Sequence, residues 1–243
     1  MKKNRMMRLA SGLLVAVLLS TCAISGTFAK YVTTASGSDT ARVAKWGVEI
    51  SGMADGLFAK TYAKDTETDI ANTVEATEEV VAPGTKNDNG VTFSLTGTPE
   101  VAVKIDIVVK GSTTDTITDV VLPVGTYTDW TQAPYTNTFD LAAAYNPVVF
   151  TLKDGTTTLA TGTLAQIESF LEEKSDEYAP GTDLSKILGG TSGTYTLTWA
   201  WAFAGNDKAD TLLGNLADGN QSAIEGASIT VDFAIVITAT QID

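Results

Sequence analysis

Apolar and polar residues alternate with a period of two along much of the chain after residue 43. In residues 101–109 the apolar side chains fall at odd positions, and residues 229–237 repeat the pattern. This alternation is typical of a strand with one buried face, and the many Thr, Val and Ile residues suit a pleated surface. The pattern predicts seven strands, over residues 43–50, 91–95, 101–109, 117–122, 148–152, 195–203 and 229–237.

Three shorter stretches have helical spacing. Residues 163–172 place apolar side chains three or four apart, and Thr163 can form a capping box with Gln166. Residues 183–188 and 207–216 predict two further short helices. Residues 61–90 and 125–147 predict long surface excursions, the second rich in aromatic side chains. The chain is therefore expected to form one all-β domain over residues 43–243, a jelly-roll-like antiparallel β-sandwich with a few short inserted helices.

The first 29 residues have the pattern of a secretory signal peptide. Four basic residues precede an apolar run over residues 9–24, and Thr27-Phe28-Ala29 fits a small-x-small cleavage site. We predict cleavage between Ala29 and Lys30, which would leave a polar, extended segment at residues 30–42 as the new amino terminus. A membrane anchor is the first alternative, although the run is shorter than the roughly 20 residues that a spanning helix needs. Acylation at Cys22 is the second, but Thr21 before it is bulkier than such sites usually allow.

Removing residues 1–29 changes the chemistry of the product. The remaining 214 residues contain no Cys and no His, because the only Cys of the chain is Cys22. Four of the 16 basic residues and none of the 29 acidic ones lie in the signal, so the remainder has a formal charge of −17. Such a chain repels nucleic acid and anionic lipid, so we expect neither as a partner, and membrane contact only through an uncleaved signal.

The composition argues against an enzyme. Without His or a thiol in the processed chain, neither a Ser-His-Asp triad nor a Cys-His pair can form, and no phosphate-binding glycine loop is present. A carboxylate pair could still hydrolyse glycosides, but among 29 acidic residues some pair will always look suitable. We therefore expect no catalytic residues, with a secreted hydrolase as the least favoured reading.

Two clusters are candidate binding features. Asn206, Asp207 and Asp210 have an oxygen-rich spacing that could hold Ca²⁺, although acidic residues at the start of a helix explain it more simply. Trp199 and Trp201 share one face of a predicted strand and could bind glycans. At strand spacing beside Leu197 and Phe203, they more often fill a sandwich core. No other cofactor is expected.

Several motifs, in this order along the chain, resemble the TasA/camelysin family of secreted Gram-positive biofilm-matrix fibre proteins. The family is known for a Gly-Thr-aromatic-Ala-aromatic run at a signal end cut by a dedicated signal peptidase. In this chain Lys30 separates Ala29 from the aromatic Tyr31, and residues 86–90 separate Pro83-Gly84 from its strand. The stretches that carry the resemblance are residues 26–31, 33–50, 83–85, 91–94, 199–203 with 207–211, 226–233 and 239–241.

The resemblance implies a jelly-roll-like sandwich that polymerises into extracellular matrix fibres. Camelysins have been classed as metalloproteases, but this chain has no His-Glu-x-x-His motif, so that activity is not carried over. The expected location is the extracellular matrix or the cell surface. The expected partners are other copies of the chain, with minor matrix or anchoring proteins as further candidates.

Donation of a strand would explain such polymerisation. A free, extended amino terminus can pair with an open sheet edge of a neighbouring subunit, and head-to-tail contacts of this kind build open filaments. We predict Tyr31, Val32, Thr34 and Ala35 as the donor contacts. Residues 30–42 could instead form a disordered tail or a strand of their own subunit. A monomeric surface adhesin or glycan-binding module, using Trp130 and Tyr135, is the alternative function.

Overall fold

The computed structural model describes residues 42–52, 56–60, 62 and 78–242. Residues 44–243 form one compact unit. The unit is an all-β sandwich of antiparallel sheets with short helices, which confirms the predicted fold class. No helix in the described residues is long and apolar enough to cross a bilayer.

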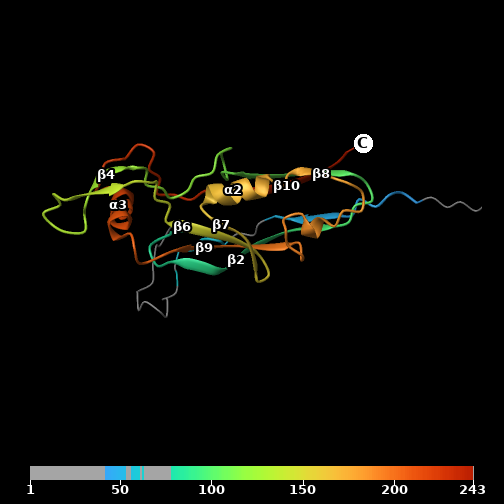
Figure 1. Cartoon of the computed structure of the whole chain (residues 1–243), viewed down its shortest axis with the longest axis horizontal. Helices are drawn as coiled ribbons and strands as arrows, with labels where there is room; N and C mark the ends of the chain where they lie inside the picture. The colour runs from blue at the N-terminus through green and yellow to red at the C-terminus, as the bar shows by residue number, and fades with distance from the viewer. Residues whose placement is uncertain (1–41, 53–55, 61, 63–77, 243) are drawn as a thin grey trace, which may run out of the picture. The chain divides into compact units, whose positions relative to one another are not determined.

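The larger sheet has five strands in the order β1-β2-β9-β6-β7. The smaller sheet has the order β10-β3-β8, and Figure 1 shows these strands in a separate layer from β2, β9 and β6. Within these two sheets every strand pairing is antiparallel. The strands of the two sheets are β1 (Val48–Ser51), β2 (Lys86–Gly97), β3 (Val103–Lys110), β6 (Val148–Asp154), β7 (Thr157–Gly162), β8 (Asp176–Tyr178), β9 (Thr194–Trp201) and β10 (Ala234–Gln241).

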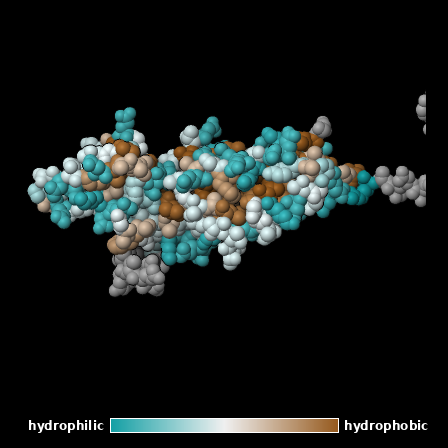
Figure 2. Space-filling view, in the orientation of Figure 1, coloured by the Kyte–Doolittle hydropathy of each residue, from teal (hydrophilic) through white to brown (hydrophobic). Residues whose placement is uncertain are grey.

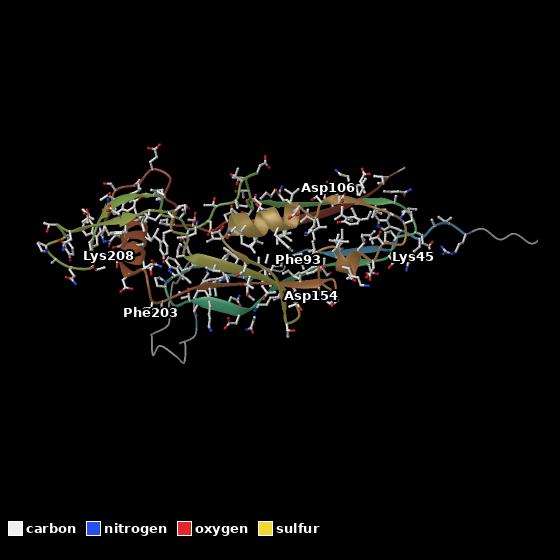
Figure 3. The ribbon with its side chains drawn as sticks, viewed as in Figure 1. Lys45, Phe93, Asp106, Asp154, Phe203 and Lys208 are labelled. Carbon is white, nitrogen blue, oxygen red and sulfur yellow. The ribbon has the colours of Figure 1, made fainter. Side chains whose placement is uncertain are left out.

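The core lies between the sheets, where alternate side chains of facing strands meet. In β3 every second side chain from Val103 to Val109 is buried, and in β9 the buried set runs from Tyr195 to Trp201. Phe93 on β2 points between the layers and is also buried (Figure 3). Trp199 and Trp201 are 2% and 6% exposed, so the prediction that they fill the core is confirmed. Phe203, expected on the same strand, is instead 50% exposed, because β9 ends at Trp201.

A hairpin and a helix stand together at one end of the unit (Figure 1). The hairpin joins β4 (Gly125–Thr128) to β5 (Thr138–Leu141), and the helix is α3 (Asp207–Ala217). Lys208 on α3 lies 2.8 Å from the Asp129 carboxylate just after β4. Helix α2 (Leu164–Glu172) begins with the predicted capping box, and residues 184–186 form one 3₁₀ turn, η1 (Leu184–Lys186).

Several predicted boundaries were wrong. The stretch 117–122 makes only isolated bridges, because Thr118 and Val121 each pair at one point with residues 228–232 and Leu122 pairs with Tyr145 of another segment. The first strand begins only at Val48, since Gly47 has φ +59°. The last strand starts at Ala234, and residues 86–90 belong to β2 around a bulge. Residues 125–147 are not a plain excursion, since they contain the hairpin, and β7 and β8 were not predicted.

Candidate functional site

The predicted cleavage and donor residues lie outside the described part of the chain. Ala29, Lys30, Tyr31, Val32, Thr34 and Ala35 all precede residue 42, where the description begins. Their roles therefore stay predictions. What the structure does describe is the sandwich that a donor strand would have to join.

The sandwich has incompletely covered edge strands at β1 and β10. Among the described residues β1 pairs with β2 alone and β10 with β3 alone. Ile50 of β1 lies opposite Leu95, and Ile237 of β10 lies opposite Ile107, so both isoleucines face the core. Leu95 and Ile107 are buried, yet Ile50 is 38% exposed and Ile237 is half-buried. The core is therefore covered on the inner strands and incompletely covered at these two edges.

The β7 side of the sandwich is covered differently. Helix α2 contacts β3 of the small sheet and both β6 and β7 of the large one. Its apolar side chains Leu164, Ile167 and Leu171 are buried against them. No described helix contacts β1 or β10 in this way. Figure 2 shows hydrophobic patches among hydrophilic surface along the middle of the displayed face.

A cavity of about 720 Å³ lies where the end of β1 approaches the start of β10. It is lined by Gly52, residues 56–58, Glu79, Ser112 and residues 231–235. Its apolar wall includes Phe58 and Phe233, whose rings meet edge to face at 6.5 Å between centroids. The cavity thus combines an aromatic wall with a polar rim.

The Leu57–Phe58 wall is held by hydrogen bonds to one carbonyl. The Trp199 indole donates to the Leu57 oxygen at 2.8 Å, and the Asn87 amide donates to the same oxygen at 2.9 Å. The Phe58 and Tyr62 rings pack on Trp199, with centroids 5.5 and 5.4 Å away. Burial raises the pKa of the Tyr62 hydroxyl, which accepts a hydrogen bond from the Ala59 amide. The wall is therefore fixed from β2 and β9 rather than by its own short sequence.

The rim of the cavity is acidic. Both carboxylate oxygens of Asp232 accept the Ser112 amide hydrogen, at 3.1 and 3.2 Å, which fixes the Asp232 side chain. Glu79 is exposed and forms no salt bridge with a described residue. Lys110 is opposite Ala234 in the strand register, but it faces away from the core because its neighbour Val109 faces inward. No basic side chain lines the cavity among the described residues.

The candidate calcium residues lie at the start of α3 and are partly used by the fold. The Asp210 carboxylate accepts hydrogen bonds from the Tyr145 hydroxyl at 2.7 Å and the Trp201 indole at 3.2 Å. Burial raises the pKa of Asp210. Asn206 and Asp207 line a separate cavity of about 470 Å³ beside β5. The described residues contain no group of three or more acidic, His or Cys side chains positioned to bind a metal.

An ion pair between a buried carboxylate and a half-exposed lysine at this end was missed from the sequence. Asp129 is 5% exposed and accepts hydrogen bonds from both the Thr131 amide and hydroxyl. Its hydrogen-bonded contact with Lys208, followed by the bonds from Thr131, lowers the pKa of Asp129 to about 2. No local pattern could reveal it, since Lys208 lies on a helix far along the chain.

The aromatic pair proposed for glycan binding is assembled only in part. The Trp130 and Tyr135 rings lie 5.2 Å apart between centroids and are tilted by 34°. Tyr135 is 47% exposed, whereas Trp130 is half-buried. The exposed Tyr135 ring and the half-buried Trp130 ring together offer only a small aromatic surface to a glycan.

Comparisons of the chain with protein-family models, with curated proteins and with solved structures gave no match.

Proposed function

We propose that the protein is a secreted structural subunit that polymerises head-to-tail into extracellular matrix fibres. In this proposal residues 30–42, released by cleavage after Ala29, add as a strand at the β1/β10 side of the next subunit. The observation that supports it is a pair of core-facing edge residues that the sheets leave incompletely covered, the exposed Ile50 and the half-buried Ile237. No enzymatic activity is part of the proposal.

Strand addition would satisfy two needs of this edge. The outward main-chain N–H and C=O groups of β10 would gain partners, because an edge strand can pair on its second side. Apolar area around Ile50 and Ile237 would also leave water, at roughly 25 cal/mol per Å². A strand given by one copy and received by the next leaves a donor and an acceptor at opposite ends of every oligomer, which permits open growth.

A charge placed at the edge tests the proposal. Ile237→Lys would put an inward-pointing charge into the acceptor edge, a device that blocks strand addition in natural sheets. Val236→Lys is the matched control, because Val236 is the next residue of β10, is 39% exposed and faces outward. Far-ultraviolet circular dichroism should first establish that both variants are folded.

We expect chains that begin at Lys30 to form filaments in negative-stain images, and the Val236→Lys variant to form them as well. The Ile237→Lys variant should stay monomeric. Filaments of unchanged number and form from Ile237→Lys would rule out the β10 edge as the acceptor. A monomeric parent chain that binds glycans through Trp130 and Tyr135 would favour the adhesin alternative.

A further inference from the structure

We propose that the 720 Å³ cavity beside β10 receives Lys30 and Tyr31 of the neighbouring subunit, so that the acceptor edge selects a processed amino terminus. This inference rests on the proposed fibre function and adds to it a docking residue and a control by cleavage. Three properties of the cavity support it: its volume, its aromatic wall and its acidic lining.

The size of the cavity favours Lys30 and Tyr31, the tip of the donor segment, as its occupants. Between residues 30 and 42 the only aromatic side chain is Tyr31, and residues 33–41 are all Thr, Ser, Ala, Gly or Asp. A cavity of about 720 Å³ falls within the range of about 300–1,000 Å³ that small-molecule pockets occupy. Small side chains would leave it unfilled, whereas a tyrosine ring with a neighbouring lysine would occupy much of it.

The wall suits an aromatic occupant. Phe58 and Phe233 already form an edge-to-face pair, and the Leu57 and Ile235 side chains are buried beside them. A third ring could add another edge-to-face contact, and a tyrosine hydroxyl could remain at the polar rim. The hydrogen bonds from Trp199 and Asn87 to the Leu57 carbonyl hold this wall in place in the absence of a partner.

The acidic lining of the cavity favours a donor segment whose signal has been cleaved. Glu79 and Asp232 line the rim, and no described basic side chain lines it with them. Cleavage after Ala29 would create an α-amino group next to the Lys30 ammonium, so the new tip carries two positive charges. In the precursor the same nitrogen is an uncharged amide, joined to the signal and its apolar run over residues 9–24. The acidic rim would therefore distinguish a processed donor from an unprocessed one.

A peptide-binding experiment tests this inference. Residues 43–243 can serve as the acceptor, because residues 44–243 form a compact unit with their own core. The probes are synthetic peptides of residues 30–42 with a dye at the carboxyl end. One has a free amino terminus, one is acetylated and one has the substitution Tyr31→Ala, and affinity is read from fluorescence anisotropy.

We expect acetylation to weaken binding about threefold or more, in the range of partly exposed charge pairs. Tyr31→Ala should weaken it about tenfold, because a buried ring is lost. In the acceptor, Glu79→Gln and Asp232→Asn should reduce the preference for the free amine. Glu177→Gln on the distant strand β8 is the matched control and should not.

Equal affinity of the free and acetylated peptides would overturn the inference and leave the fibre proposal standing. So would a photo-crosslinker at position 31 that labels the Gln241 end of β10 instead of residues 57–58 and 233–235. Failure of every peptide to bind would overturn the fibre proposal and this inference with it.

Discussion

The pair of hydrogen bonds that the Leu57 carbonyl accepts offers a strict test of what holds the wall of the acceptor cavity. Trp199 and Asn87 donate to the same oxygen, so either can be removed while the other still satisfies it. The perturbation is the pair Trp199→Phe and Asn87→Ala, made singly and together. Phenylalanine keeps a ring in the core next to Phe58 and Tyr62 but has no N–H to donate.

The expected magnitudes follow from the geometry. Trp199→Phe loses one hydrogen bond, a net cost of about 1 kcal/mol, and leaves a small cavity worth about 1–2 kcal/mol. The larger penalty for an unsatisfied buried carbonyl does not apply, because Asn87 still donates. In the double variant no donor remains, so the orphaned carbonyl adds about 1–3 kcal/mol beyond the sum of the single effects.

Urea denaturation of residues 43–243, followed by tryptophan fluorescence and circular dichroism, measures the four free energies of unfolding in this cycle. We expect a coupling of at least about 1 kcal/mol, with the double variant less stable than additivity predicts. Additive single effects would mean that the two donors do not share the Leu57 carbonyl in solution. The account of a fixed cavity wall would then be refuted.

Four further changes test other parts of the fold. Asp129, with a pKa of about 2 against an ordinary 3.8, stabilises the folded state above pH 4 and loses this contribution as pH falls toward 2. The Asp129→Asn variant should be less stable at neutral pH and show a weaker loss over that window in pH-dependent urea titrations. Thr163→Ala should lower the free energy of unfolding by about 1 kcal/mol, because it removes the α2 capping box. Gly190→Ala should destabilise the folded state, since its Cβ would collide with an Asp154 carboxylate oxygen. Gly214→Ala inside α3 meets nothing within 4 Å and should raise the melting temperature, through a gain of up to about 1 kcal/mol.

The central strands could be predicted from the sequence because both of their neighbours are in the same sheet. In β3 and β9 one face is fully buried, so period-two alternation is strong and marks the elements clearly. The same holds for α2, where a capping box marks the first turn locally.

The edges of the sheets could not be predicted as well. In β7 and β8 fewer side chains are buried, so alternation is weak, and residues 117–122 make only isolated bridges, to residues 228–232 and to Tyr145. The acceptor cavity likewise depends on contacts between distant residues. Trp199 and Leu57 are 142 positions apart, and no local spacing links them. Sequence reasoning could propose a donor segment but not the cavity that would receive it.

The most direct test of the central claim is amide hydrogen exchange, comparing filaments of chains that begin at Lys30 with monomers of residues 43–243. A strand added at the β1/β10 side should slow exchange in residues 48–51 or 234–241, because outward amides of an edge strand gain partners. Residues 157–162 of β7, an edge strand on the other side of the large sheet, should exchange at an unchanged rate. Protection confined to β7, or filaments with no added protection at β1 and β10, would contradict the account.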